Sequence, residues 1–253
     1  MNPKKDLLPE ELIPEKQLRR RTLKAFAWFG LASLVPVGVW KWLTVQPKVA
    51  GLRKPLRQVL DMNNQVNSAY LSDTHLAPTF PKERAARQVR VNGRDGLKSP
   101  LDLATWRLRV EQPGKPALEL TLDDLKNLPK QDLIFDFKCV EGWSQIQHWG
   151  GVRFSDVVKK YSLGAGNKYV GLETPDRGYY VGLDIRSALH PQTLLAFEMN
   201  GAPLTTDHGA PLRLIIPVKY GVKSLKRIGT IRFADTRPRD FWAERGYDYD
   251  LAL

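Results

Sequence analysis

The sequence predicts a β-rich α+β domain that follows one apolar segment of membrane-spanning length. Short apolar runs rich in β-branched and aromatic residues recur between Thr105 and Ala234, separated by Gly, Pro, Asn and Asp, a pattern typical of strands and turns. Short helical patterns lie between some of these runs, which indicates an α+β domain. Hydrophobic residues make up 42% of the 253 residues and charged residues 26%, which excludes a disordered, collagenous or coiled-coil chain.

The apolar segment covers residues 25–45 and carries one charge, Lys41, near its far end. At a rise of 1.5 Å per residue it makes a helix of about 31 Å, enough to cross a hydrocarbon core of about 30 Å. Trp28, Trp40 and Trp42 lie towards its two ends, where indole rings favour the headgroup layer. We therefore expect a transmembrane anchor or signal segment. A buried helix of a soluble domain is the weaker alternative, because no comparable helical partner follows.

Residues 19–24, Arg-Arg-Arg-Thr-Leu-Lys, precede this segment and resemble the twin-arginine export signal, with Thr22 in place of the usual apolar residue. Ordinary positive charge on the cytoplasmic side of a span explains the same residues. Both interpretations predict a single-pass inner-membrane protein with residues 1–24 in the cytoplasm and a periplasmic body. No A-x-A pattern follows closely, so we expect an uncleaved anchor.

The net charge of +12 belongs mainly to the N-terminal part of the chain. Residues 1–24 carry seven basic and four acidic side chains (+3), and residues 25–60 carry five basic and no acidic ones (+5). The remaining 27 basic and 23 acidic side chains leave only +4 for residues 61–253, which argues against nucleic-acid binding. Residues 46–90 mix Pro, Lys and Arg, and we expect them to be a tether that wraps onto a domain at 91–253.

The elements expected in the body alternate short strands with short helices. The strands are expected at 105–111, 118–122, 132–140, 168–174, 179–185, 194–199, 212–217 and 228–234. Asp123 or Asp124 is expected to open one short helix, and Ser155 to cap another with Asp156 in its first turn. Turns are expected at Pro-Asp-Arg-Gly, residues 175–178, and at the hairpin signal Asn-Gly, residues 200–201.

Cys139 is the only cysteine, which excludes an intramolecular disulfide, a four-cysteine zinc site, an iron-sulfur cluster and a C-x-x-C-H haem attachment. It ends an apolar strand and precedes Val-Glu-Gly-Trp-Ser, residues 140–144. A lone cysteine at such a place is commonly a small buried hydrophobe. Zinc is a competing use for the four histidines, but their spacings fit no common zinc motif. The histidines are at positions 75, 148, 190 and 208.

Two glycine-containing basic stretches flank the strand at 212–217. One is residues 208–213, His-Gly-Ala-Pro-Leu-Arg, and the other is residues 219–226, Lys-Tyr-Gly-Val-Lys-Ser-Leu-Lys. Glycine allows backbone N–H groups to approach an anion, while Arg offers a planar fork and Lys a mobile charge for phosphate. A solvated basic loop and a hairpin glycine explain the same residues equally well.

Taken together, these motifs resemble the sulfite oxidase family of molybdopterin-dependent oxidoreductases, from about residue 106 to 233. The segment CVEGWS, residues 139–144, is similar to the family's metal-binding segment, and residues 194–226 are similar to its pterin-binding stretch. The resemblance implies a mixed sulfite-oxidase-like fold that binds a molybdenum-molybdopterin cofactor, with Cys139 as the catalytic metal ligand. A soft thiolate suits this redox-active metal.

The resemblance also assigns cofactor contacts to individual positions. They are Thr174, His208, Arg213, Ser224, Leu225 and Lys226, together with Thr74 and His75 in a segment that matches only loosely. In that loose segment, Thr74 stands where the family frequently has Asn. Tyr220 and Trp143 are candidates for the substrate pocket, although ordinary packing explains either residue.

The cysteine motif is similar to the bacterial branch that contains periplasmic methionine sulfoxide reductase catalytic subunits. Sulfite-oxidising members usually carry an arginine shortly after the cysteine, whereas this chain has Gly142 and Trp143. An apolar indole suits a neutral sulfoxide or related oxide, small or protein-borne. We expect oxygen-atom transfer coupled to Mo(VI)/Mo(IV), with electrons exchanged with a membrane b-type or soluble c-type cytochrome.

Two alternatives remain open at this stage. One is a sulfite-oxidising enzyme of the same family. The other is a metal-free, membrane-tethered β-rich binding or assembly module that keeps the fold without the cofactor.

Overall fold

The structure is a computed structural model and describes residues 14–253. The chain divides into two units, residues 1–48 with 53–55, and residues 49–52 with 56–253. The first unit is dominated by one long helix. The second holds the two five-stranded sheets and the remaining helices.

The long helix α1 (Glu15–Val45) is continuous over 31 residues and contains Pro36. It is the one helix in the described part of the chain that is long and apolar enough to cross a membrane. Its most apolar window has a mean hydropathy of 1.5, and no side chain there is buried in the protein. The helix begins ten residues before the apolar segment, so the arginines of residues 19–21 are helical.

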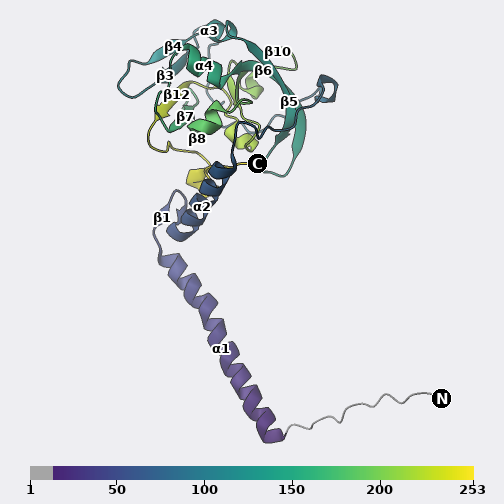
Figure 1. Cartoon of the computed structure of the whole chain (residues 1–253), viewed down its shortest axis with the longest axis vertical. Coiled ribbons are helices and arrows are strands. Elements are labelled where there is room, and N and C mark those ends of the chain that lie inside the picture. Colours follow the sequence, from purple (N-terminus) through teal and green to yellow (C-terminus); the bar gives the residue numbers. More distant parts are fainter. Residues whose placement is uncertain (1–13) are drawn as a thin grey trace, which may run out of the picture. The chain divides into compact units, whose positions relative to one another are not determined.

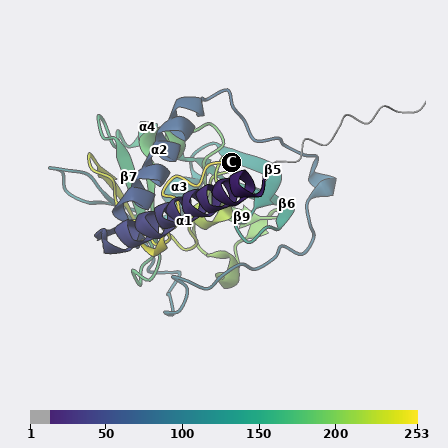
Figure 2. The same ribbon diagram turned by 90° about the horizontal axis from the view of Figure 1, so that it is seen from below.

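One sheet contains five strands: β5 (Lys130–Lys138), β6 (Ser144–Arg153), β9 (Leu194–Met199), β10 (Ala202–Pro203) and β11 (Arg213–Ile215). Its order is β10-β9-β6-β5, with β11 also paired to β9, and every pairing is antiparallel. β5, β6 and β9 lie side by side (Figure 2). β5 and β6 form a hairpin with nine residue pairs, from Lys130 opposite Val152 to Lys138 opposite Ser144. Residues 139–143 therefore form its closing loop.

The other sheet also contains five strands: β3 (Leu108–Glu111), β4 (Leu118–Leu120), β7 (Tyr169–Glu173), β8 (Tyr180–Asp184) and β12 (Thr230–Ala234). Its order is β4-β3-β12-β7-β8 (Figure 1), with β12 parallel to β3 and the other pairs antiparallel. The predicted turn at 175–178 joins β7 to β8, and the predicted Asn-Gly turn joins β9 to β10. Both turn predictions are confirmed.

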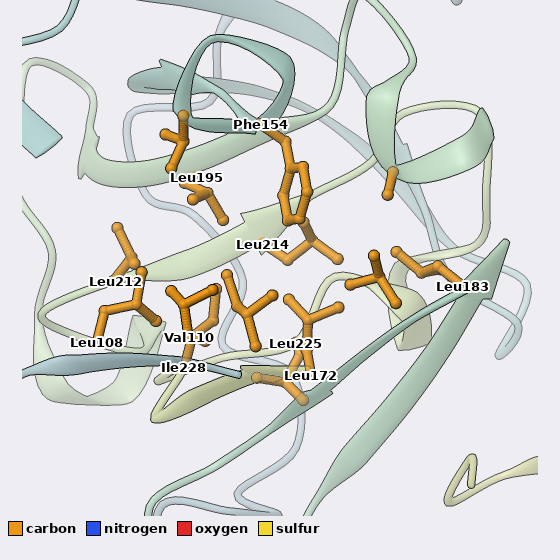
Figure 3. Packing of buried hydrophobic residues seen from close by; sticks show 14 of the residues in the cluster. Leu108, Val110, Phe154, Leu172, Leu183, Leu195, Leu212, Leu214, Leu225 and Ile228 are labelled. Carbon is orange, nitrogen blue, oxygen red and sulfur yellow. The ribbon is translucent and has the colours of Figure 1, made fainter. Parts of the chain in front are cut away.

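The main hydrophobic core joins the two sheets. Figure 3 shows Leu108 and Val110 of β3, Leu172 of β7, Leu195 of β9 and Leu214 of β11 packed together. A second, smaller cluster lies on the opposite face of the β5–β6–β9 sheet and is built on aromatic residues of β5 and Trp149 of β6. Successive side chains of a strand point to opposite faces, and for this reason β9 contributes to both clusters.

The short helices of the body are α3 (Leu122–Lys126), α4 (Phe154–Lys160) and α5 (Ile185–Leu189). The predicted starts of two of them are wrong. Thr121 caps α3, since its hydroxyl accepts the N–H of Asp124 while the Asp124 carboxylate accepts the N–H of Thr121. α4 begins at Phe154, which is buried in the main core, so Ser155 lies inside the first turn instead of capping it.

Residues 46–90 are more ordered than the predicted tether. They contain a two-stranded ribbon of β1 (Lys48–Val49) and β2 (Leu52–Arg53), followed by the 17-residue helix α2 (Lys54–Tyr70). A 3-10 turn at Lys82–Arg84 follows. The prediction missed α2 because its polar residues and its Pro and basic neighbours obscured an apolar pattern with helical spacing.

Candidate active site

A cavity of about 300 Å³ lies beside the closing loop of the β5–β6 hairpin. Segments that are far apart in the sequence line it: residues 89–95, the hairpin around Cys139, residues 208–213, and residues 221–226. Tyr179, Trp242 and Tyr247 complete the wall. The cavity therefore brings the predicted cysteine motif and both basic stretches to one place.

The hairpin loop fixes Cys139 at the cavity wall. The backbone N–H of Cys139 donates to the carbonyl of Trp143 (2.9 Å), and the Cys139 carbonyl accepts the N–H of Gly142 (3.1 Å). Gly142 has φ of +85°, a conformation that glycine adopts without strain. The Cys139 residue is 3% exposed, and its Sγ accepts a hydrogen bond from Asn92 Nδ2 (3.3 Å). The sulfur is thus held in place at a cavity.

Arg213, the first residue of β11, supplies a fully buried cation to the same cavity. Its two terminal nitrogens donate to the carbonyls of His208 and Ser224, each at 3.1 Å, and its guanidinium carbon lies 4.4 Å from the centroid of the Trp149 ring. Burial lowers the pKa of Arg213 to about 9. Within residues 14–253 no carboxylate forms an ion pair with it. Such an uncompensated cation is costly unless an anion binds beside it.

Lys226 adds a second cation. Its Nζ donates to the carbonyls of Gly93 (3.0 Å) and Asp207 (2.8 Å) and pairs with no carboxylate in the described part of the chain. Burial, reinforced by the charge of Arg213, lowers the pKa of Lys226 to about 7. Gly209, with φ of +95°, permits the close approach, because an added Cβ would lie 2.7 Å from that of Lys226. The two basic stretches therefore meet at this point.

His208 and Ser224 also line the cavity. Burial lowers the pKa of His208 to about 4, and the charges of Arg213 and Lys226 act in the same direction, so the imidazole is neutral near pH 7. The hydroxyl of Ser224 accepts the backbone N–H of Ile216 (3.3 Å), the residue directly after β11, which closes the loop between these two positions.

The cavity mouth has charges of both signs and an aromatic wall. The guanidinium of Arg90 lies 4.6 Å from the centroid of the Trp143 ring, and Trp143 Nε1 donates to a Glu141 carboxylate oxygen (2.9 Å). The Trp143 ring also stacks on Phe137, with centroids 6.2 Å apart and an interplanar angle of 25°. Arg90 and Glu141 carry opposite charges, and Asp95 is a further exposed acidic residue of the cavity lining.

Several predicted contact residues do not line the cavity. Thr174 is buried, with its hydroxyl bonded to Asp176 Oδ1 (2.6 Å) and to the backbone of Tyr179 in the β7–β8 turn. Leu225 is wholly buried in the main core, between two residues that do line the cavity. Thr74 and His75 are exposed, the former bonded to Ser72 and the latter packed against Tyr70.

Tyr220, the other substrate-pocket candidate, also lies outside the cavity lining, whereas Trp143 lies within it. The four histidines do not gather into a metal site. Residues 14–253 contain no group of three or more His, Cys, Asp or Glu side chains placed to hold a metal ion. The structure therefore gives no support to the zinc alternative.

Sequence reasoning missed Asn92, Arg90, Gln147, Trp149 and Tyr179 as cavity residues. Asn92 precedes a glycine in a stretch without strong periodicity, and nothing local connects it to a cysteine 47 positions later. Gln147 and Trp149 lie inside β6 and fit a buried strand. The two residues are two positions apart, so their side chains point to the same face of β6, and this alternation is the signal that could have identified them.

The comparisons with known proteins point to one family. Residues 96–242, more than half of the chain, match the family described as oxidoreductase molybdopterin binding domain. A protein of Azospira oryzae that carries the name of a protein-methionine-sulfoxide reductase subunit, YedZ1, is 34% identical over 190 residues, which cover 74% of this chain and 72% of the relative.

A protein-methionine-sulfoxide reductase catalytic subunit, MsrP, of Xanthomonas axonopodis is 38% identical over 161 residues, 56% of this chain and 49% of the relative. The MsrP of Campylobacter jejuni is 31% identical over 162 residues, 58% of this chain and 54% of the relative. The chain thus spans about half the length of these catalytic subunits.

Among solved structures, the sulfane dehydrogenase SoxCD from Paracoccus pantotrophus matches with a TM-score of 0.50 and 19% identity. The match covers 55% of this chain and 40% of that one. At this identity the likeness concerns the fold alone. It confirms the predicted β-rich, sulfite-oxidase-like α+β architecture.

The cavity itself fits the molybdenum cofactor of this family. Buried Arg213 Nε, Trp149 Nε1 and Gln147 Oε1 on its wall have no hydrogen-bond partner within the described protein atoms, so a polar ligand would satisfy them. The unpaired cations suit a phosphate, and the thiol of Cys139 suits a soft metal. This chemistry agrees with the match over residues 96–242, and the chain therefore belongs to the molybdopterin-binding oxidoreductase family, whose members are molybdenum-dependent enzymes.

Proposed function

We propose that this chain is a membrane-anchored reductase that transfers an oxygen atom from a sulfoxide or related oxide, small or protein-borne. In this proposal residues 1–24 are cytoplasmic and residues 25–45 cross the inner membrane. Residues 46–90 lead from the membrane to the domain and contribute Val89 and Arg90 to its cavity, and residues 91–253 form the rest of the periplasmic catalytic domain. The observation that carries it is the meeting of the Cys139 thiol with two cations that pair with no carboxylate in the described residues, buried Arg213 and half-buried Lys226, at one cavity.

The residues of the cavity divide into two groups by chemistry. Cys139 would ligate the metal, with Asn92 orienting its sulfur through the hydrogen bond to Sγ. Arg213 and Lys226 would hold the phosphate of the pterin, and His208 would contact it as a neutral group. Thr174 and Leu225 would act indirectly, because the first fixes the β7–β8 turn and the second anchors the loop of Ser224 and Lys226 in the core.

When bound, the cofactor supplies the two-electron Mo(VI)/Mo(IV) change that accompanies oxygen-atom transfer. The protein supplies the entrance for the substrate. The stacked rings of Trp143 and Phe137 offer an apolar surface, and the exposed acidic residues Glu141 and Asp95 accompany Arg90 in the lining. Such a mouth favours a neutral sulfoxide over a dianion. The names of the MsrP relatives support the same substrate class.

Sulfite oxidation is the second candidate, and Arg90 is the observation that favours it. The sequence has no arginine directly after the cysteine, yet folding brings Arg90 to the cavity from a segment about 50 residues earlier. If sulfite is the substrate, Arg90 would be a cation that attracts it.

Electrons would come from a separate protein, a membrane b-type or a soluble c-type cytochrome. The sequence holds one cysteine and no C-x-x-C-H motif, and Cys139 is already assigned to the metal. An anchor that confines both proteins to one membrane would raise their effective concentration.

The test uses holoenzyme purified from its native membrane, and the variants Cys139→Ser and Arg90→Gln. Methionine sulfoxide is assayed with a reduced dye, and sulfite with an oxidised dye. We expect the wild-type protein to reduce the sulfoxide and Cys139→Ser to abolish this activity. Arg90→Gln should change the KM for the sulfoxide by less than threefold. Sulfite turnover without sulfoxide turnover, and a sulfite KM at least tenfold higher in Arg90→Gln, would favour the second candidate and refute the first.

A further inference from the structure

Helix α2 exposes an apolar stripe along its length. The stripe consists of Leu56, Val59, Met62, Val66 and Tyr70, which are between 42% and 68% exposed. Their spacing of three or four residues places them within an arc of about 120° on a helix of 3.6 residues per turn. A helix on the surface of a globular domain normally turns such a stripe inward. Here it faces outward.

The opposite face of α2 is polar and buried. Arg57, only 5% exposed, donates to the carbonyls of Ala50 (2.5 Å), Ala243 (2.6 Å) and Tyr247 (3.0 Å). These bonds fix the helix to the C-terminal part of the domain through directed contacts. The outward direction of the apolar stripe is therefore built into the fold.

Two further contacts support this arrangement. The side-chain oxygen of buried Asn64 accepts the backbone N–H of Asp250 (3.1 Å), and Asp61 pairs with Arg237 (2.7 Å). Because Arg57, Asp61 and Asn64 repeat at helical spacing, the whole inner face is held. A rotation that buried the apolar stripe would break all of these contacts.

The start of α2 is tied to the residues that follow α1. The N–H of Lys54, the first residue of α2, donates to the carbonyl of Pro47 (2.9 Å), and Arg53 donates to the carbonyl of Gln46 (2.6 Å). Gln46 directly follows the last residue of α1. If α1 crosses the membrane, α2 therefore begins at the membrane surface.

We infer that α2 lies in the interfacial layer of the membrane that α1 crosses, with its apolar stripe among the upper acyl chains. This inference rests on the proposed membrane anchoring. Lys48, Arg53 and Lys54 stand at the end of α2 nearest α1, where cations attract anionic headgroups, and Tyr70 ends the stripe with an aromatic ring suited to the interface. Contact along α2 would hold the catalytic domain in one orientation to the membrane.

The experiment uses the full chain, carrying cofactor, in lipid nanodiscs of phosphatidylethanolamine and phosphatidylglycerol without other proteins. A photoreactive aliphatic residue replaces Val59 or Val66 in the stripe, or Leu103 as the control. Leu103 and Val59 are both 56% exposed, so they differ in location and not in accessibility. After illumination, lipid adducts on the protein are measured by mass spectrometry.

We expect lipid adducts at Val59 and Val66 at least fivefold above those at Leu103. Equal yields at the three positions would overturn the inference. The same variants illuminated in native membranes should again form lipid adducts, and a predominant adduct with another protein would instead identify α2 as a protein-docking helix and overturn the lipid assignment. A fourth photoreactive position, Val35 in α1, tests the membrane anchor separately from the role of α2. Lipid adducts at Val35 without adducts at Val59 refute only the role of α2, whereas their absence at Val35 refutes the membrane anchor.

Discussion

The loop that carries Ser224 and Lys226 into the cavity depends on a buried ion pair. Lys223 Nζ lies 2.5 Å from Asp240 Oδ2 and also donates to the carbonyl of Gly182 (3.1 Å), and the two side chains are 1% and 2% exposed. Burial lowers the pKa of Lys223, while Asp240 opposes that change. Replacing Lys223 by Met removes the cation and leaves the Asp240 carboxylate buried, which should cost about 3 to 5 kcal/mol of unfolding free energy.

Asp240 accepts further hydrogen bonds, and these affect how its variants are interpreted. The carboxylate also accepts the backbone N–H groups of Gly182 (3.1 Å), Trp242 (3.2 Å) and Ala243 (3.0 Å), which Asp240→Asn keeps in part. That variant leaves the Lys223 ammonium unpaired, at a similar cost of about 3 to 5 kcal/mol. The double variant should lose about 2 to 3 kcal/mol less than the two single losses combined, because it removes both charges together.

The assay is urea unfolding of the apoprotein in detergent, so that bound cofactor does not mask the loss, together with molybdenum content of the holoprotein. The exposed pair Lys126–Asp123, with 3.8 Å between the charged atoms, provides the control, and Lys126→Met should cost less than about 0.5 kcal/mol. Single losses below about 1 kcal/mol, or strictly additive losses in the double variant, would refute the role assigned to the buried pair.

Three further predictions concern the cavity and the anchor. The folded pKa of His208, about 4, lies below its unfolded value of about 6.5, so the unfolded apoprotein gains the proton first and stability should fall by up to about 3 kcal/mol between pH 6.5 and pH 4. His208→Gln should flatten that interval in urea titrations, and parallel curves would contradict the assignment. Lys226→Met should weaken cofactor retention about tenfold or more, as loss of one charge-assisted bond to phosphate implies, while Lys226→Arg keeps most of it; molybdenum measured after dialysis tests this, and equal retention by all three proteins would refute it. Replacing Arg19 and Arg20 by Lys should leave the protein in the cytoplasm, as measured by fractionation and protease protection, and normal export would disprove the twin-arginine interpretation.

The parts of the fold that sequence predicts well are those that local pattern determines. Alternating apolar residues located the strands on either side of the turn at 175–178, and the Asn200-Gly201 dipeptide marked a hairpin that the structure contains. The start of α4 was less predictable because tertiary packing decides it, whereas the start of α3 was missed although Thr121 and Asp124 form a local capping box. Phe154 enters the main core and begins α4 one residue before the expected cap, Ser155.

The same reasoning predicted only some of the residues of the candidate site. Cys139, Arg213 and Lys226 carry recognisable chemistry within motifs, and the structure brings all three to one cavity. Asn92 and Arg90 could not be found in this way, because only the three-dimensional fold brings their segment to the hairpin loop. Motif residues show what the cavity binds, whereas the residues that shape its mouth come from a segment without a motif.

For helix α2, the direction in which the apolar stripe points could not be predicted from the sequence. Spacing alone, counted over residues 56–70, would have predicted a helix, but it would also have predicted that the apolar stripe faces the core. The direction is decided by Arg57, whose guanidinium donates to three carbonyl groups from two separate segments, around Ala50 and between Ala243 and Tyr247, a geometry that no local pattern encodes. Turning the stripe inward would bury apolar area, but it would break the three hydrogen bonds of Arg57 and leave the carbonyl groups of Ala50, Ala243 and Tyr247 without this donor. Acyl chains against the outer face would remove the cost of exposing the apolar stripe to water. The hydrogen bond from Lys54 to the carbonyl of Pro47 keeps the start of α2 close to the end of α1, and therefore close to the membrane that α1 is proposed to cross.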